Sequence, residues 1–176
     1  MLEEFKPTWM VKSIYSVLPA QLKENGIKAV FSDLDNTLIA WNNPNGTEEL
    51  HQWMDELKEN NIPLIVISNN NKKRIEKAVA PLGLPFMARS LKPLSFGIDR
   101  ARKKLGLKKE EVVMVGDQLM TDMLAAHHAG VRSILVKPII ETDKWTTKIN
   151  RTLEKQVWRE LKKKYPNLTW QEELND

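Results

Sequence analysis

The residues of this sequence best suited to chemistry are two aspartates one position apart, Asp33 and Asp35. They directly follow an apolar run at 28–32 that predicts a buried strand, and Asn36 and Thr37 come next. In an open α/β sheet, ligands bind beyond the carboxyl ends of the strands, where side chains from several strands converge. The alternative is that these residues only cap a helix or form an Asx turn. The pair therefore needs partners elsewhere in the chain.

Such partners follow the other apolar runs of the sequence. In chain order, the polar groups found after these runs are Asp33 and Asp35, then Ser68 and Asn69, then Lys92, and finally Asp117 with Asp122. Carboxylates can bind a cation, and a hydroxyl and an ammonium can bind phosphate oxygens. A second acid close to the first completes the set that phosphoryl transfer requires. The sequence therefore indicates one constellation at one edge of a sheet.

The elements that must position these groups alternate along the chain. Five apolar runs predict strands, at about 28–32, 62–67, 85–88, 112–115 and 131–136. Helical patterns occupy about 9–23, 47–60, 72–82, 94–105, 123–129 and 144–165, with Pro19 kinking or ending the first. Strands that alternate with helices at this spacing form right-handed βαβ units. We therefore predict an α/β fold with a central parallel sheet of about five strands.

The bulk properties limit the remaining choices. At 176 residues, the chain can bury most of one core, so we expect a single domain over 1–176. It contains no cysteine, which excludes thiolate metal sites and cysteine nucleophiles and favours a hard cation held by oxygen. The net charge of +4 does not by itself predict nucleic-acid or membrane binding. No apolar run approaches the roughly 20 residues of a membrane span, so we expect a cytoplasmic protein.

Taken together, the ordered groups resemble the motifs of haloacid dehalogenase-like (HAD) phosphatases. The resemblance covers about 28–136 and rests on Asp33-Leu34-Asp35-Asn36-Thr37, Ser68-Asn69, Lys92-Pro93 and Gly116-Asp117 with Asp122. Each motif alone is weak evidence, whereas four in the family's order are strong evidence. The resemblance implies a Rossmann-like three-layer sandwich and a Mg2+-dependent phosphomonoester hydrolase.

The resemblance also implies which residues perform the reaction. Asp33 would be the nucleophile that forms an aspartyl-phosphate. Asp35 would protonate the leaving oxygen and then deprotonate water. An acid at this position favours ester hydrolysis, because an alcohol leaving group needs a proton. Mg2+ would be held by the Asp33 carboxylate, the Asp35 backbone carbonyl and Asp117, while Lys92 balances the phosphate charge.

Four further residues receive supporting roles from the resemblance. Ser68 and Asn69, with nearby backbone N–H groups, would bind the phosphate oxygens. Asp122 would orient Lys92 or a water on the metal. Thr37 would fix the loop after Asp35. These assignments complete the predicted site.

The connections between the motifs leave no room for a large cap domain. The interval 38–62 contains one turn-rich segment and one helix, and few residues separate Ala88 from Lys92. With the form of the segment 116–122, this resembles capless subclass III (IIIA), which includes phosphatidylglycerophosphate phosphatases. The resemblance implies an open site for a bulky phosphate ester such as a phospholipid monoester, which Trp41 could contact. Closure by a partner subunit of a homo-oligomer, or by the substrate itself, is the alternative.

Residues 144–165 predict a basic amphipathic helix. Its apolar residues are Ile149, Leu153, Val157, Leu161 and Tyr165, and its basic residues on the opposite side are Lys144, Lys148, Arg151, Lys155, Arg159, Lys162 and Lys163. Such a helix can lie on anionic lipid, which would place the protein peripherally at the inner face of the membrane. We favour the simpler interpretation that its apolar side packs on the protein and its charged side faces solvent.

Two other classes of protein use similar residues. A signalling receiver domain also has an acidic pair, a hydroxyl and a lysine, but its lysine comes last, whereas Lys92 precedes Asp117 here. A non-catalytic phosphatase-like module could bind RNA or an assembly through its basic C-terminal helix. The presence of Asp33, Asp35, Lys92 and Asp117 argues against lost catalysis, and the sequence carries no strong nucleic-acid signal.

Overall fold

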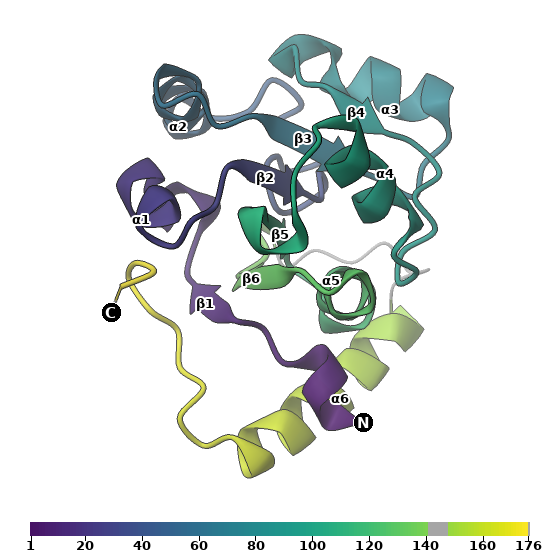
Figure 1. Ribbon diagram of the computed structural model, residues 1–176. Helices are drawn as coiled ribbons and strands as arrows, with labels where there is room; N and C mark the ends of the chain where they lie inside the picture. The colour runs from purple at the N-terminus through teal and green to yellow at the C-terminus, as the bar shows by residue number, and fades with distance from the viewer. Residues whose placement is uncertain (141–147, 176) are drawn as a thin grey trace.

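The computed structural model describes residues 1–140 and 148–175. Within these residues a parallel sheet has the strand order β1-β6-β5-β2-β3-β4 (Figure 1). Its strands are β1 (Trp9–Val11), β2 (Ala29–Ser32), β3 (Leu64–Ile67), β4 (Phe86–Met87), β5 (Val112–Gly116) and β6 (Arg132–Val136). The predicted parallel α/β architecture is confirmed, although the described sheet contains a sixth strand, β1, that the sequence analysis did not predict.

Helices connect the successive strands, and one more helix follows the last strand. They are α1 (Pro19–Glu24), α2 (Glu48–Glu59), α3 (Lys72–Val79), α4 (Phe96–Lys104), α5 (Leu124–Ala129) and α6 (Lys148–Lys164). The shorter turns are η1 (Leu2–Phe5), η2 (Ile14–Ser16), η3 (Ala80–Leu82), η4 (Lys109–Glu111) and the π-helical η5 (Leu119–Met123). Thr47 caps α2, because its side chain accepts a hydrogen bond from the N–H of Leu50.

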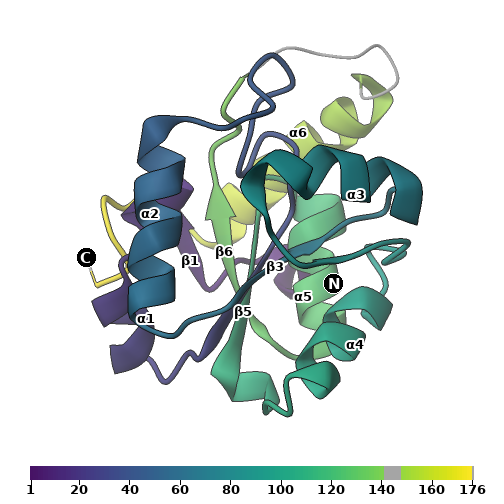
Figure 2. The same cartoon turned by 90° about the horizontal axis from the view of Figure 1, so that it is seen from above.

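The two faces of the sheet are covered by different helices. Alternate strand residues point to opposite faces, so Val30 packs with α1, α2 and α3, whereas Phe31 packs with α4 and α5. The views in Figures 1 and 2 show these helices as layers on either side of the sheet. Strands buried on both faces explain the uninterrupted apolar runs in the sequence. The result is the three-layer arrangement that was predicted.

The prediction of a helix over 9–23 is wrong. Trp9–Val11 forms the edge strand β1, which pairs in parallel with β6, and Met10 and Val11 point into two different apolar clusters. Pro19 does not kink a helix but occupies the first turn of α1, where its missing N–H has no cost. The apolar spacing in this segment fits a helix, and pairing with a strand more than 120 residues away overrides it.

The C-terminal helix α6 packs beside the β1 edge of the sheet (Figure 1). Leu161 is fully buried against Met10 and Leu135, whereas Leu153 is 42% exposed. The docked interpretation therefore holds for the second half of this helix. Residues 144–147 of the predicted helix and the side chains of 148–150 lie outside the described residues. Along the parts of the chain that the structure describes, no helix is both long enough and apolar enough to cross a bilayer.

Candidate active site

The chemically competent residues lie where the central strands end. Asp33 follows β2, and its backbone N–H donates to the carbonyl of Val115 in the neighbouring β5 at 3.0 Å. Asp117 follows Gly116, the last residue of β5. Because β5, β2, β3 and β4 are adjacent and parallel, the segments after them lie at one edge of the sheet. This edge is where the sequence predicted a site.

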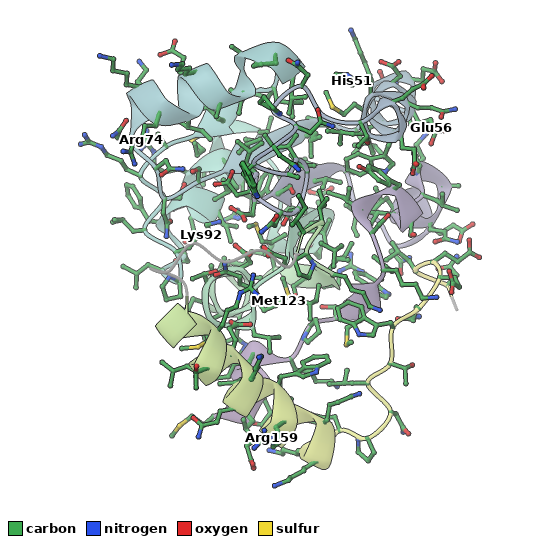
Figure 3. The ribbon with its side chains drawn as sticks, turned by 180° about the vertical axis from the view of Figure 1, so that it is seen from behind. His51, Glu56, Arg74, Lys92, Met123 and Arg159 are labelled. Atoms are coloured by element: carbon green, nitrogen blue, oxygen red, sulfur yellow. The ribbon has the colours of Figure 1, made fainter. Side chains whose placement is uncertain are left out.

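The Lys92 ammonium joins the segments that follow β2 and β5. Its Nζ donates to Asp33 Oδ1 at 2.9 Å and to Asp122 Oδ1 at 2.9 Å. The Lys92 and Asp122 side chains are 4% and 1% exposed, whereas the Asp33 side chain is 20% exposed. Carboxylate oxygens of Asp33, Asp117 and Asp122 all lie within 4.8 Å of one another. Figure 3 labels Lys92, seen from behind the molecule. We call Asp33, Lys92, Asp117 and Asp122 the acidic–lysine cluster.

The backbone around Lys92 is held tightly by the segment after β3. Asn69 Oδ1 accepts from the N–H of Lys92 at 2.7 Å, and Asn69 Nδ2 donates to the Lys92 carbonyl at 2.9 Å. Leu91, the preceding residue, has a φ of +57°, which a residue with a bulky side chain rarely adopts. Such conformations persist where the surrounding contacts enforce them, and they concentrate at functional sites. The Asn69 contacts are the constraint that fixes Lys92 here.

The segment after β5 is shaped so that both of its acids can enter the cluster. A Cβ atom on Gly116 would lie 2.3 Å from Asp122 Cγ, so only glycine permits Asp122 to pack this close to the strand. The N–H of Gln118 donates to Asp122 Oδ2 at 3.3 Å, and Thr37 Oγ1 donates to Asp117 Oδ1 at 3.3 Å. Thr37 thus links the segments after β2 and β5 as a second connection beside Lys92.

The cluster has an excess of negative charge. Burial raises the pKa of Asp117 well above its usual range, and the nearby charges of Asp122 and Asp33 raise it further. Burial also raises the pKa of Asp122 to about 6, although the Lys92 ammonium opposes that shift. Burial lowers the pKa of Lys92, but the carboxylates of Asp122 and Asp33 outweigh it and the net shift is upward. Lys92 is therefore an ammonium at neutral pH that faces three carboxyl groups.

The remaining predicted residues lie on segments that border the cluster. Asp35 is exposed in the turn after β2, and an isolated bridge pairs it with Ile39. Ser68 is buried directly after β3, and its Oγ accepts from the N–H of Asn70 at 3.1 Å. The structure therefore joins Asp33, Lys92, Asp117, Asp122 and Thr37 through side-chain contacts, and it connects Asn69 to them through the Lys92 backbone.

One residue near the site was missed by the sequence analysis. Glu154 of α6 accepts a hydrogen bond from the N–H of Leu119 at 3.0 Å and another from the N–H of Met120. Leu119 and Met120 are two and three residues after Asp117. No motif contains Glu154, and its partners are backbone groups, so the sequence carries no local signal for this contact.

A parallel three-layer α/β fold with an aspartate pair after β2, a lysine after β4 and a Gly-Asp step at the end of β5 defines a HAD-type phosphatase. Residues 91–158 match the family model for HAD-hydrolase-like proteins. The chain is 40% identical to "Probable phosphatase YqeG" of Bacillus subtilis (strain 168) over 168 residues, which cover 96% of this chain and 97% of that protein. The chain belongs to the HAD-like hydrolases and shares its family with YqeG.

Solved structures support the fold. A protein of unassigned function from Listeria monocytogenes serotype 4b matches with a TM-score of 0.53 at 14% identity, covering 76% of this chain and 99% of that one. A structure described as a predicted phosphoglycolate phosphatase from Haemophilus somnus 129PT matches with a TM-score of 0.50 at 17% identity, covering 62% and 85%. The non-catalytic alternative is not favoured, because the relative over nearly the whole chain is a phosphatase by name.

The raised pKa of Asp117 predicts that this residue lowers the stability of the metal-free protein. A buried carboxyl with a raised folded-state pKa carries no penalty below its unfolded-state pKa of about 3.9, and the full penalty above its folded-state pKa. Asp117→Asn should therefore raise the Tm in EDTA at pH 7.5, by roughly 2–4 °C per kcal/mol gained, and the gain should shrink toward pH 4.

Differential scanning calorimetry at pH 4.5 and 7.5 measures this difference. Asp55→Asn, on the exposed side of α2, is the matched control and should leave the Tm unchanged at both pH values. A variant at position 117 that is less stable than the wild type at pH 7.5 contradicts the electrostatic interpretation.

Proposed function

We propose that this protein is a Mg2+-dependent phosphomonoester hydrolase that forms an aspartyl-phosphate on Asp33. The observation that carries the proposal is the acidic–lysine cluster, in which the Lys92 ammonium lies 2.9 Å from both Asp33 and Asp122. A carboxylate attacking a phosphate must overcome repulsion between two anions, so positive charge at that point lowers the barrier. Asp33 has the more exposed of the two paired carboxylates, which suits a nucleophile.

The carboxylates of the cluster fit a divalent cation. A bound cation would favour the ionised form of all three carboxyl groups, whose oxygens lie within 4.8 Å of one another and which together outnumber the single ammonium of Lys92. Carboxylate and carbonyl oxygens are the ligands that Mg2+ prefers. We assign the ion to the Asp33 carboxylate, Asp117 and the backbone carbonyl of Asp35. When bound, Mg2+ supplies charge neutralisation and holds the phosphoryl group in line with the nucleophile.

The reaction proceeds in two displacements at phosphorus. Asp33 attacks, the bond from phosphorus to the ester oxygen breaks, and Asp35 gives its proton to that oxygen. Water then attacks the aspartyl-phosphate and gives a proton to Asp35, and the bond from phosphorus to Asp33 breaks to release inorganic phosphate. Lys92 stays protonated throughout and balances the charge of the transferred group. The two half-reactions together therefore return the enzyme to its starting state.

The residues around the cluster hold the phosphate and the catalytic groups in place. Ser68 and the second N–H of the Asn69 amide bind non-bridging oxygens, since the first N–H already donates to Lys92. Asp122 orients Lys92 through the 2.9 Å bond, and Thr37 orients Asp117.

For the substrate, we propose a phospholipid monoester such as phosphatidylglycerophosphate, in a site of the capless subclass IIIA type. The connections 33–47 and 88–95 are short, and they present Trp41 and Leu91, which are 67% and 55% exposed. Exposed apolar side chains on the connections that carry Asp35 and Lys92 suit a substrate with a lipid body. Lys155 and Arg159 on the exposed side of α6 would hold the protein peripherally at the anionic inner face of the membrane.

Replacement of the nucleophile should abolish turnover. Asp33→Asn removes the attacking carboxylate, so hydrolysis of an aryl phosphate should fall by about 10⁴-fold or more. EDTA should have a similar effect on the wild type, and added Mg2+ should reverse it. Release of the aryl alcohol, followed by absorbance, measures both, with Asp55→Asn as the control. An unaffected rate for the position 33 variant would remove the nucleophile assignment.

Replacement of the general acid should depend on the leaving group. Asp35→Asn should slow enzyme phosphorylation by an alkyl phosphate by roughly 10² to 10⁴-fold, and by an aryl phosphate far less, because aryl oxide leaves without a proton. The pre-steady-state burst of alcohol release isolates this step from the later attack of water. Equal losses with the two substrates argue against Asp35 as the acid.

The lipid proposal predicts a preference between substrates of the same chemistry. Phosphatidylglycerophosphate in anionic vesicles should be hydrolysed with a higher kcat/KM than soluble glycerol phosphate. The double variant Lys155→Glu/Arg159→Glu should bind these vesicles about 30-fold more weakly or worse, since each of the two basic residues near an anionic surface contributes about 1 kcal/mol. Its rate on aryl phosphate should not change.

Lys58→Glu/Lys104→Glu is the charge-matched control, since both lysines are exposed near the C-terminal ends of α2 and α4, away from the site edge. Inorganic phosphate release and vesicle sedimentation measure rate and binding. Equal rates on the lipid and the soluble ester, with no effect of the α6 variant, leave the hydrolase proposal intact but rule out the lipid one.

A further inference from the structure

The side chain of Glu154 forms a bridge between the C-terminal helix and the segment that carries Asp117 and Asp122. Its Oε2 accepts from the N–H of Leu119 at 3.0 Å and its Oε1 accepts from the N–H of Met120. These N–H groups belong to the first turn of η5, where a helix offers them no internal acceptor. Glu154 therefore satisfies both from a helix 34 and 35 residues further along the chain.

The contact is partly buried, which makes the choice of a carboxylate informative. Burial raises the pKa of Glu154, and the two backbone hydrogen bonds oppose that shift. Leu161 of the same helix packs with Leu119 and Met123 in one apolar cluster, so apolar contacts already attach α6 to this segment. Even a partly buried carboxylate carries a desolvation cost that an apolar side chain would avoid. The Glu154 carboxylate instead fixes the positions of the Leu119 and Met120 N–H groups.

Those two backbone groups lie between the acids of the candidate site. The Leu119 N–H is two residues after Asp117, and the Met120 N–H is two residues before Asp122. Within the segment, the N–H of Gln118 donates to Asp122 Oδ2. From α6, Glu154 accepts from the next two N–H groups. Three consecutive N–H groups between the acids are therefore held by side-chain carboxylates.

We propose that Glu154 is a positioning residue, which fixes the segment 117–122 in the conformation that binds the divalent cation. This inference rests on the proposed function, because it assigns that cation to Asp117. It also makes α6 part of the catalytic unit and extends that unit beyond the region of the four motifs. The match to the HAD-hydrolase-like family model, over 91–158, includes position 154 together with Lys92 and Asp117.

Substitutions at position 154 test the bridge with readouts that do not depend on turnover. Glu154→Ala removes both acceptors, and Glu154→Gln keeps one carbonyl oxygen. Glu160→Ala is the matched control on the same helix, since Glu160 is exposed and pairs with Lys163 at 3.3 Å. Isothermal titration calorimetry measures the Kd of Mg2+, and NMR hydrogen exchange measures protection of the Leu119 and Met120 amides. Circular dichroism confirms that each variant is folded at the temperature used.

Glu154→Ala should raise the Kd of Mg2+ by about 10-fold or more, as is usual when a group that orients a metal ligand is removed. The exchange of the Leu119 and Met120 amides should accelerate, Glu154→Gln should fall between Glu154→Ala and the wild type, and Glu160→Ala should match the wild type. Excess Mg2+ should restore the aryl phosphatase rate of Glu154→Ala. If Glu154 only stabilised the fold, added Mg2+ would not change the rate at a temperature where the variant is fully folded.

Two results would overturn the inference, and they have different consequences for the proposed function. If the wild type and Glu154→Ala bind Mg2+ with equal affinity, Glu154 has no positioning role and the hydrolase proposal still stands. A wild type that binds no divalent cation removes the Mg2+ requirement from the proposed function, and the positioning role is lost with it. If Glu154→Ala does not fold, the same comparison is made with Glu154→Gln.

Discussion

A buried ammonium needs carboxylate partners, and the arrangement of the whole site depends on this requirement. The Lys92 side chain is 4% exposed, and a buried charge without a partner costs several kcal/mol. Its partners are 59 residues earlier, at Asp33, and 30 residues later, at Asp122. The requirement is mutual, since Asp122 is 1% exposed and without Lys92 would be an isolated buried anion. Three remote segments must therefore meet for any of them to be stable in this position.

The sheet makes this meeting possible, because its strands are parallel and adjacent. With β5, β2, β3 and β4 side by side, every segment that leaves a carboxyl end emerges at the same edge. Strands buried on both faces fix the register of these ends, as the pairing of Phe31 with Ile65 and Met114 shows. The glycine at 116 then lets Asp122 approach the strand end within a distance that any side chain would prevent. The apolar core thus compensates for a cluster that is electrostatically unfavourable without a cation.

The sequence predicted the parts of this structure whose signals are local. Acids directly after an apolar run identify a strand end, so Asp33 and Asp117 could be placed at one edge of the sheet from the sequence alone. The edge strand β1 could not be predicted, because its three residues resemble one turn of an amphipathic helix and only pairing with β6 decides their conformation. Glu154 could not either, since its hydrogen-bond partners are backbone N–H groups that any sequence supplies. The misses are therefore contacts between remote segments that carry no pattern of their own.

The helix α6 connects the protein surface to the site, and its geometry limits how it can contact a partner. Leu161 is already buried against the body, so this part of the apolar side cannot also insert into lipid. Any contact through Lys155 and Arg159 would be electrostatic, and salt would screen it over about 10 Å. Because an α-helix rises only about 1.5 Å per residue, these basic residues lie within about two turns of Glu154 and move with it. A surface that contacted Lys155 and Arg159 would therefore lie on the same helix as the carboxylate that binds the segment 117–122.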